Sequence, residues 1–327
     1  MKAVIVRKPG GVEELEIGEV STPKPEGNEI LVKVYAAALN RADIMQRQGK
    51  YPPPAGVSEI LGLEIAGEVF SAGNKVEKWK KGDKIFGLVP GGGNAEFAVI
   101  DERMANPIPS NLSYEEAAAI PEVFLTAYQA LYWHAKLKKG EKILIHAGGS
   151  GVGTAAIQMA KIIGSVIYIT ASKEKHSMCL NLGAKAAIDY KNENFEEKVT
   201  QLTEGKGVDV IIDFLAGPYF MQNLKSLTFD GRLIMLATLG GTKMENANIG
   251  SILSKRLTII GSNLRGRTRD YQIKLNNEFY EYAYEKFRDG VLKPVIDKVF
   301  NWKDVAKAHL YMEANKNTGK IVLKIFD

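Results

Sequence analysis

A glycine-rich segment between an apolar strand pattern and a helix pattern constrains the fold of this 327-residue chain more than any other feature. Residues 142–146 are a short apolar run, and residues 152–163 carry apolar side chains at helical spacing. A turn of this kind presents backbone N–H groups and the positive end of a helix dipole, which together suit a pyrophosphate. The segment therefore predicts a dinucleotide-binding strand–turn–helix unit, with a purely structural turn as the alternative. The residues expected to line the cofactor are Gly148, Gly149, Ser150, Gly151, Val152 and Gly153.

The sequence on either side of this turn divides into a β-rich part and an alternating part. Residues 1–7, 29–37 and 65–71 are rich in strand-forming residues and are separated by turns, which predicts a compact β unit. After Pro121, short apolar runs alternate with stretches of helical spacing, which is typical of βαβ units and a parallel sheet. The expected strands are 142–146, 165–170, 208–213, 231–236 and 257–262, and the expected helices are 122–135, 152–163, 173–182 and 218–227.

The last part of the chain returns to a mixed pattern. A long amphipathic helix is predicted over residues 271–289, and strand, helix and strand follow over 294–300, 303–314 and 320–326. Because these few strands cannot bury a core of their own, the tail is expected to complete the first domain rather than to form a third. The chain is thus predicted to be an α/β protein, with a doubly wound parallel sheet and a β-rich domain.

Composition and charge mainly exclude other classes of protein. Lys and Arg total 43 against 38 Asp and Glu, and the resulting net charge of +5 does not by itself indicate a nucleic-acid partner. The single cysteine, Cys179, excludes an intramolecular disulfide and any zinc site built on several cysteines. The N-terminal apolar run stops at Arg7, and no run approaches the length of a membrane span, so a cytoplasmic location is expected.

The strand after the glycine-rich turn indicates which nicotinamide cofactor to expect. Sites for NAD usually place an acid about 20 residues after the turn, but no acid ends the strand here. Ser172 and Lys175 stand in that region, and a hydroxyl and an ammonium suit the 2′-phosphate of NADP(H). In the alternative, Lys173 and Lys175 are solvated residues in the first turn of a helix.

A set of motifs in consistent order gives the chain a family resemblance. The motifs are residues 38–43, 49–53, 61–64, 82–83, 120–122, 125–128, the glycine-rich turn and 314–320. Together they resemble the quinone oxidoreductase branch of the zinc-free medium-chain dehydrogenase/reductase superfamily, which is zeta-crystallin-like, and most closely its p53-inducible group. The resemblance implies a GroES-like catalytic domain formed by residues 1–120 and 271–327, with a Rossmann NADP-binding domain, residues 121–270, inserted between them.

The resemblance also bears on metal chemistry and on the site residues. Zinc alcohol dehydrogenases of this superfamily place a catalytic cysteine and a histidine in two of these motifs, where this sequence has Asn40 and Leu63. The four histidines are scattered, and His146 is expected to be packed or hydrogen-bonded rather than a ligand, so no metal site is expected. In one interpretation, the carboxylates carried over by motif are structural and the tyrosine is a packed loop residue. The site residues carried over are Asn40, Asp43, Tyr51, Glu64 and Thr126.

Further cofactor contacts follow from the same resemblance. Ser172, Lys175 and Tyr190 match the 2′-phosphate and adenosine side, and Leu239 and Gly240 follow a predicted parallel strand. In an alternative interpretation, three of the basic residues in these segments are ordinary surface charges: Arg265, Arg267 and Lys320. The remaining residues expected to contact the cofactor are Ser262, Leu264, Arg265 and Lys320.

The function implied is reduction of a small-molecule quinone, or another electron-poor acceptor, directly by NADPH, with neither zinc nor flavin. Whether one electron or a hydride is transferred stays open. An NADPH-dependent enone or enoyl-thioester reductase is the enzyme alternative, and a nucleotide-binding protein with an RNA-binding or structural role is the alternative of another class. Neither a membrane nor a nucleic acid is expected as a partner, and a homodimer through the nucleotide-binding domain is implied by the resemblance.

Overall fold

The computed structural model describes residues 1–244 and 247–326 of the chain. Internal contacts divide it into two compact units. Unit 1 comprises Met1–Leu125 and Arg265–Asp327, and unit 2 comprises Thr126–Leu264. Within the described residues, every helix is too short or too polar to cross a lipid bilayer.

Unit 1 is built on a seven-stranded sheet that joins the two ends of the chain. Its strand order is β14-β15-β3-β4-β5-β7, and β6 pairs with β3. The tail strand β15 runs antiparallel to β3, with Ile321 opposite Leu39, so the C-terminal segment is a central part of this sheet. The bounds are β3 (Glu29–Leu39), β4 (Glu64–Ala72), β5 (Lys84–Leu88), β6 (Phe97–Asp101), β7 (Ala105–Pro107), β14 (Ile296–Asn301) and β15 (Lys320–Lys324).

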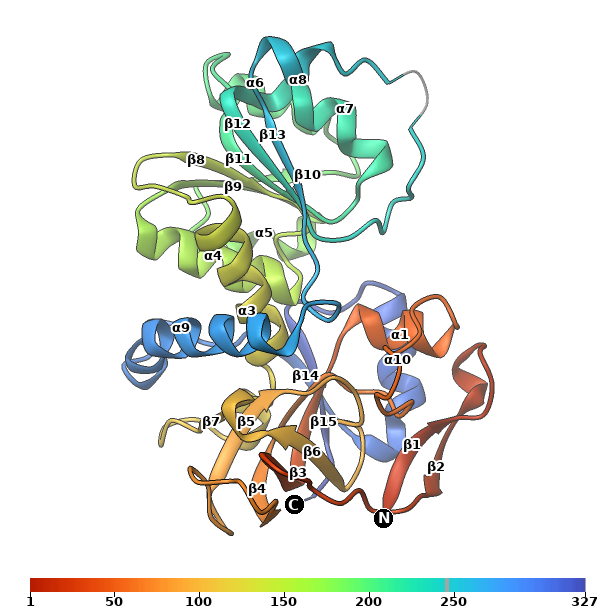
Figure 1. Cartoon of the computed structure of the whole chain (residues 1–327). Coiled ribbons are helices and arrows are strands. Elements are labelled where there is room, and N and C mark those ends of the chain that lie inside the picture. The colour runs from red at the N-terminus through yellow and green to blue at the C-terminus, as the bar shows by residue number, and fades with distance from the viewer. Residues whose placement is uncertain (245–246, 327) are drawn as a thin grey trace. The chain divides into compact units, whose positions relative to one another are not determined.

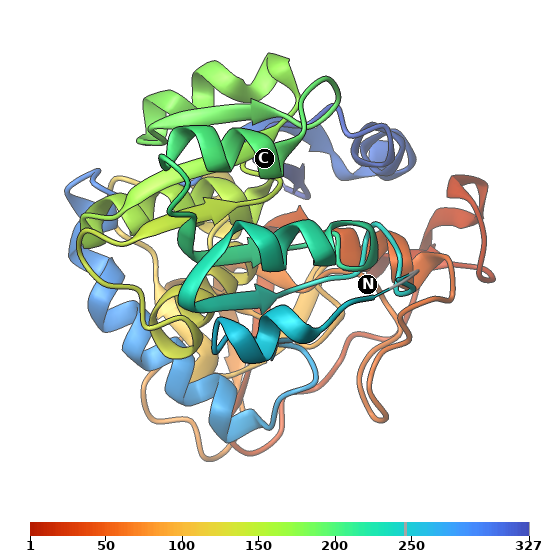
Figure 2. The same cartoon turned by 90° about the horizontal axis from the view of Figure 1, so that it is seen from above.

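Helices and one hairpin complete unit 1. The longest helix, α9 (Arg269–Arg288), begins at the N-cap Thr268 and is continuous in Figure 2. Its apolar face packs on the start of α3, where the ring of Phe124 lies 6.3 Å from that of Phe279 and 5.0 Å from that of Phe287. The other elements are β1 (Lys2–Val6), β2 (Leu15–Glu19), α1 (Arg41–Arg47), α2 (Tyr114–Ala118), α3 (Pro121–Tyr128), α10 (Val305–Glu313) and the 3₁₀ turns Val12–Glu14, Glu102–Met104 and Trp302–Asp304.

Unit 2 is a six-stranded parallel sheet with helices on both faces. Its order is β10-β9-β8-β11-β12-β13, so the strand order reverses between β8 and β11. Figure 1 shows α4 and α5 on one face of this sheet and α6, α7 and α8 on the other. The bounds are β8 (Lys142–Ile145), α4 (Gly151–Ile163), β9 (Val166–Ala171), α5 (His176–Leu182), β10 (Ala186–Asp189), α6 (Phe195–Leu202), β11 (Val208–Asp213), α7 (Gly217–Ser226), β12 (Leu227–Met235), α8 (Gly250–Ser254) and β13 (Thr258–Gly261).

The predicted α/β class is confirmed, and the differences from the predicted elements are local. The helix expected over residues 122–135 is α-helical only to Tyr128, and Gln129–His134 form a wider π-helical turn. Apolar spacing over so few residues does not distinguish these two windings. The helix expected over 173–182 opens with a 3₁₀ turn, Lys173–Lys175, before α5 begins. The sequence patterns did not predict β10 or α6, and for β10 the reason is that a four-residue strand carries little periodic signal.

His146, at the end of β8, is part of the core of unit 2. It is fully buried, with its Nδ1 3.0 Å from Thr170 Oγ1 and its Nε2 2.8 Å from Asn223 Oδ1. Because an amide oxygen can only accept, Nε2 carries the hydrogen and the neutral ring is satisfied at both nitrogens. Burial lowers the pKa of His146 to about 4. The expected packed, hydrogen-bonded role of His146 therefore agrees with its surroundings.

We predict that His146 makes the protein sensitive to acid. Its pKa is lower in the folded than in the unfolded chain, so the unfolded chain binds more protons as the pH falls from about 6.5 toward about 4. This group should then remove up to about 1.4 kcal/mol of unfolding free energy per pH unit. The variant His146→Gln keeps one hydrogen-bond donor and one acceptor. Its unfolding free energy, measured by urea denaturation, should fall less steeply as the pH drops below 6.5. The same dependence of unfolding free energy on pH in both proteins would contradict this prediction.

Candidate functional site

The glycine-rich turn of unit 2 lies where the strand order of the sheet reverses. It connects β8 to α4, and in open parallel sheets ligands bind at the carboxyl ends of the strands beside this reversal. Ser150 is the N-cap of α4, and its hydroxyl accepts from the N–H of Gly153 at 3.0 Å. A Cβ on Gly153 would lie 2.7 Å from the carbonyl oxygen of Gly148, so only glycine fits there. The turn therefore has the tight backbone that a pyrophosphate site requires.

The residues after β9 lie against this turn. A Cβ on Gly149 would lie 2.7 Å from Cδ of Lys175, so the stem of Lys175 covers that glycine. Ser172 is buried, and its hydroxyl hydrogen-bonds the exposed carboxylate of Glu174, which lowers the pKa of Glu174. Two lysines and one glutamate thus follow β9, and of these Lys175 packs on the glycine-rich turn.

Most of the other residues predicted to bind the cofactor share the same edge of the sheet in unit 2. Tyr190 follows β10 and is exposed, while Leu239 and Gly240 lie in the exposed segment after β12. Ser262 follows β13, where its hydroxyl donates to Gln129 Oε1 at 3.0 Å and lies 3.1 Å from Nε2 of His134. The carboxyl ends of parallel strands meet at one edge, so the topology gathers these positions. Thr126 is partly exposed in α3, and Leu264 is buried.

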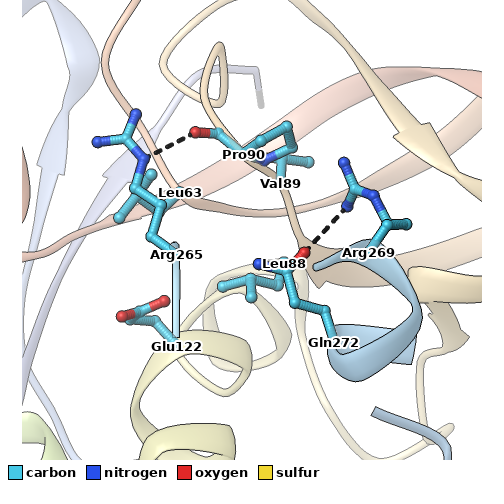
Figure 3. A pocket seen from close by; sticks show the side chains of 8 residues that line it. All are labelled: Leu63, Leu88, Val89, Pro90, Glu122, Arg265, Arg269 and Gln272. Carbon is cyan, nitrogen blue, oxygen red and sulfur yellow. Dashed lines mark hydrogen bonds between the residues drawn. The ribbon is translucent and has the colours of Figure 1, made fainter. Parts of the chain in front are cut away.

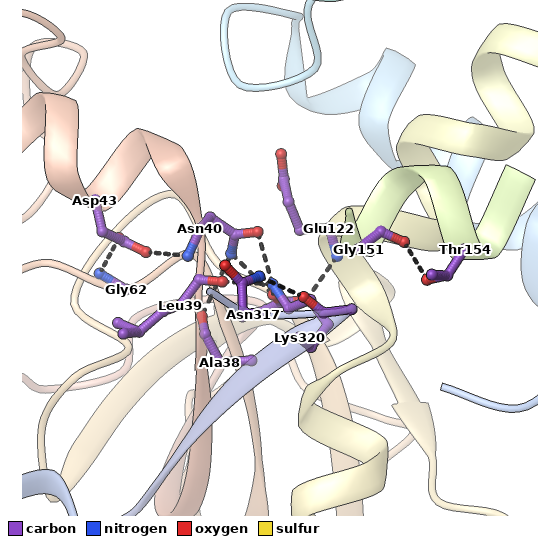
Figure 4. Close-up of polar contacts among 12 residues, drawn as sticks. Ala38, Leu39, Asn40, Asp43, Gly62, Glu122, Gly151, Thr154, Asn317 and Lys320 are labelled. Atoms are coloured by element: carbon purple, nitrogen blue, oxygen red, sulfur yellow. Dashed lines mark hydrogen bonds and ion pairs between the residues drawn. The ribbon is translucent and has the colours of Figure 1, made fainter. Parts of the chain in front are cut away.

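In unit 1, three strand ends bring together a buried polar cluster (Figure 4). Asn40 follows β3, Glu64 begins β4 and Lys320 begins β15, and both of these strands run antiparallel to β3. Lys320 Nζ lies 2.6 Å from Glu64 Oε1 and donates to Asn40 Oδ1 at 2.7 Å and to the carbonyl of Leu39 at 2.6 Å. Asn40 Nδ2 donates to Glu64 Oε1 at 2.8 Å. We call Asn40, Glu64 and Lys320 the strand-end cluster.

Lys320 is therefore neither a surface charge nor a group with spare hydrogen bonds. Its side chain is 4% exposed and that of Glu64 is fully buried. Its three contacts account for all three N–H donors of an ammonium. A contact with a phosphate of the cofactor would require one of these bonds to break.

Two further carboxyl groups, those of Asp43 and Glu122, lie next to the strand-end cluster. Asp43 closes a capping box at the start of α1, accepting from the N–H of Asn40 at 2.7 Å and from that of Gly62 at 3.0 Å. Burial raises the pKa of Asp43 to about 6. Glu122 donates its backbone N–H to Glu64 Oε2 at 2.8 Å, and burial, followed by the charge of Glu64, raises the pKa of its own carboxyl to about 7. Glu122 is thus a proton-holding group near neutral pH.

Glu122 was not among the residues predicted from the sequence. It lies in the motif 120–122, but a single glutamate at a helix start resembles an ordinary first-turn acid. It lines a small pocket of unit 1 together with Leu63, Leu88, Val89, Pro90 and Arg265 (Figure 3). The signal that identifies it is the three-dimensional proximity of Glu64, which no local pattern contains.

Arg265 and Tyr51 lie together in unit 1. The guanidinium of Arg265 is 5.4 Å from the centre of the Tyr51 ring, and its Nε donates to the carbonyl of Pro90 at 3.1 Å. Burial lowers the pKa of Arg265 and raises that of Tyr51. The ring face of Tyr51 thus contacts the arginine, and a packing role and a role at the site both stay predictions.

Comparison with known proteins places this site in a family. Residues 26–110 match the alcohol dehydrogenase GroES-like domain family, and residues 151–279 match the zinc-binding dehydrogenase family. The chain is 31% identical over 330 residues to the quinone oxidoreductase of Rattus norvegicus, covering 99% of this chain and 97% of that protein. The chain belongs to the medium-chain dehydrogenase/reductase superfamily. Its members include proteins named for quinone reduction, so this chain is an oxidoreductase of that superfamily.

Other relatives share the fold over the whole chain. The quinone oxidoreductase of Pseudomonas syringae pv. Tomato DC3000 is 29% identical, with 99% of each chain covered and a TM-score of 0.88. The CurK enoyl reductase is also 29% identical, with 99% of this chain and 98% of that chain covered and a TM-score of 0.88. A phenolphthiocerol/phthiocerol polyketide synthase polypeptide of Mycobacterium tuberculosis is 31% identical over 324 residues, and this chain spans only 14% of its length.

The donor groups at the strand ends do not fit the zinc that one family description names. Asn40 uses its amide within the strand-end cluster, Leu63 offers no ligand atom, and the Lys320 ammonium already balances Glu64. Tetrahedral zinc requires thiolate, imidazole or carboxylate donors, and a fixed ammonium repels a second cation. Across residues 1–244 and 247–326, His, Cys, Asp and Glu side chains form no group of three suited to a metal.

We predict that Lys320→Met strongly destabilises the protein. The substitution leaves the buried Glu64 carboxylate without its counter-charge, which costs about 3–5 kcal/mol when one partner of a buried pair is removed. The double variant Lys320→Met with Glu64→Gln should recover part of that loss, because no buried charge remains. Urea denaturation of the single and double variants measures the coupling, with the partly exposed Lys324→Met as a control in the same strand. A loss below about 1 kcal/mol for Lys320→Met would contradict the prediction.

Proposed function

We propose that this protein reduces a quinone directly with NADPH, without zinc or flavin. The observation that carries the proposal is the strand-end cluster, in which Lys320 supplies the positive charge beside Glu64. Because an ammonium takes the place of a metal ion in the strand-end cluster, an acceptor in this active site meets no Lewis acid. The acceptor must therefore stabilise the added electrons through its own conjugated groups. The conjugated carbonyl groups of a quinone do so, and the relatives named quinone oxidoreductase support this choice of acceptor.

The glycine-rich turn of unit 2 fits the pyrophosphate of a nicotinamide dinucleotide. Gly153 has no room for a Cβ, Gly149 lies under the stem of Lys175, and the N-terminus of α4 directs its N–H groups toward the turn. The segments after β9, β10, β12 and β13 would hold the rest of the cofactor. When bound, the dihydronicotinamide supplies the reducing equivalents, and the residues of this chain orient the two reactants and exclude water.

An NADPH-dependent enone or enoyl-thioester reductase is the second candidate. The likeness to the CurK enoyl reductase favours it, and so does Glu122, because reduction of a carbon–carbon double bond requires a proton as well as a hydride. Both candidates use an acceptor with a conjugated carbonyl. They differ in whether the acceptor carries a large thioester group.

Steady-state oxidation of NADPH distinguishes the two candidates. We expect rapid turnover with 1,2-naphthoquinone and 1,4-benzoquinone and slow turnover with crotonyl-CoA, because the quinone needs no thioester-binding surface. Added zinc or a chelator should leave the rate unchanged. Rapid turnover of crotonyl-CoA with little activity on the quinones would replace the first candidate by the second.

The preference for NADPH is part of the proposal, and it rests on Ser172 and Lys175. Lys175 packs on the glycine-rich turn, where its ammonium could meet the 2′-phosphate, and Ser172 would turn its hydroxyl from Glu174 to the same phosphate. The pair Ser172→Ala and Lys175→Ala should raise the KM for NADPH by about 10- to 100-fold and change that for NADH little.

Two matched variants test this assignment. Lys173→Ala removes a neighbouring exposed lysine and should leave the KM for NADPH unchanged. Glu174→Ala should improve NADPH binding, since it removes an acid near the phosphate. If Glu174→Ala instead abolishes the use of NADH, Glu174 binds a ribose hydroxyl, and the preference for NADPH is wrong.

A homodimer through the nucleotide-binding unit and a cytoplasmic location complete the proposal. Both follow from the family resemblance, and both stay predictions. The division of the chain into a catalytic domain and a cofactor-binding domain also stays a prediction.

A further inference from the structure

The small pocket of unit 1 contains an arginine whose hydrogen-bonding capacity is only partly used. Arg265 Nη1 and Nη2 are buried and have no hydrogen-bond partner, although Nε of the same guanidinium donates to the carbonyl of Pro90. Buried guanidinium groups normally have their N–H groups paired, because leaving them unpaired is costly. These two nitrogens therefore have unused donor capacity that an oxygen atom of a ligand would satisfy.

The surroundings of the guanidinium define what kind of oxygen fits. The pocket is about 10 Å³, which is the space of one water-sized group, so it accepts a single oxygen and not a ring. Leu63, Leu88 and Val89 make one side of it apolar. The guanidinium lies over the ring of Tyr51, 5.4 Å from its centre, and this contact favours the observed position of the donors.

Glu122 lines the same pocket. Figure 3 shows both side chains in the lining of this pocket, with Glu122 nearer the backbone end of Arg265 and the guanidinium beside Pro90. The two groups influence each other, since Arg265 opposes the rise in the pKa of Glu122 that burial and Glu64 produce. Because that pKa is raised to about 7, the carboxyl holds a proton in part of the molecules at neutral pH. A hydrogen-bond donor and a proton source thus line the same small pocket.

We propose that Arg265 binds the carbonyl oxygen of the acceptor and that Glu122 protonates this oxygen during reduction. The proposal rests on the proposed function and names two catalytic residues for it. A bound dihydronicotinamide would supply a hydride to a ring carbon of the quinone and be oxidised, and the negative charge would develop on the conjugated oxygen. Nη1 and Nη2 of Arg265 would donate to that oxygen. The O–H bond of Glu122 would then break, its proton would pass to the oxygen, and the bonding pair would stay on the carboxylate. Loss of the ring C–H proton to solvent and protonation of the second oxygen would complete the hydroquinone, and solvent would return a proton to Glu122.

Binding of 4-nitrophenol to the full-length protein without cofactor tests the role of Arg265 independently of turnover. Its phenolate resembles the charged oxygen of the reduced acceptor, and its absorbance reports ionisation directly. We expect the bound probe to be more ionised than the free probe at the same pH, and Arg265→Gln to weaken phenolate binding by about 10- to 100-fold. Arg265→Lys, which keeps the charge without the two-pronged geometry, should lie between. Arg267→Gln, an exposed arginine two residues away, is the control and should bind as the unaltered protein does.

The pH dependence of quinone reduction tests the role of Glu122. The donor form exists below a pH of about 7, so kcat should fall as the pH rises above that value. In Glu122→Gln, kcat at pH 6 should fall by at least about 10-fold and the fall above pH 7 should disappear. The same variant should bind 4-nitrophenolate more tightly above pH 7, because a neighbouring negative charge is gone. Circular dichroism and NADPH fluorescence confirm that each variant folds and binds the cofactor.

The outcomes separate the inference from the proposed function. Equal phenolate binding by Arg265→Gln and the unaltered protein overturns the role of Arg265, even if quinones are reduced. The fall of kcat above pH 7 could instead persist in Glu122→Gln and disappear in Tyr51→Phe. That result assigns the proton to Tyr51 and overturns the role of Glu122. If no quinone is reduced but the phenolate binds as expected, the proposed function fails while the oxygen site of Arg265 stands.

Discussion

The buried ion pair between Lys320 and Glu64 is the interaction on which the polar cluster of unit 1 depends. Taking both charges out of water is expensive, and only complete hydrogen bonding makes such a pair tolerable. Here the ammonium uses all its donors, and Glu64 accepts from Lys320, Asn40 and the backbone N–H of Glu122. Since Lys320 and Asn40 lie 280 residues apart, the bonds between them fix the C-terminal strand β15 beside β3.

The same pair sets the protonation of its neighbours. One ammonium balances one carboxylate, so Asp43 and Glu122 are left without a full counter-charge. Their carboxyl groups respond by holding protons, which is why burial raises their pKa values to about 6 and about 7. The carboxylate oxygens of Asp43 accept hydrogen bonds from the backbone N–H groups of Asn40 and Gly62. Glu122 instead lines the pocket that Arg265 also lines. Of the two, Glu122 is therefore the group free to exchange a proton with a ligand.

Local patterns are sufficient to predict the fold class and the edge of the sheet used for binding. The glycine-rich turn, and the short runs that alternate after it, predict a parallel sheet, and the topology then gathers Ser172, Tyr190 and Ser262 at the carboxyl ends of strands. The strand-end cluster is not predictable in this way. The sequence alone suggests that Lys320 is a phosphate contact or a surface charge, because its partners lie in segments remote along the chain. Glu122 escapes prediction for the same reason, since its chemistry comes from Glu64 and not from its neighbours in sequence.

On our proposal, the unpaired nitrogens of Arg265 bind an oxygen that the acceptors of both candidate reactions have in common. Each buried N–H group without a partner costs about 1–3 kcal/mol, and a ligand oxygen that accepts from it removes that cost. The gain requires an oxygen conjugated to the carbon that is reduced, because only then does charge develop where the guanidinium can meet it. A quinone and an enoyl thioester both have such an oxygen, and a simple alkene or alcohol does not. On our proposal, Arg265 selects the conjugated carbonyl common to both acceptors, and the rest of the acceptor decides between them.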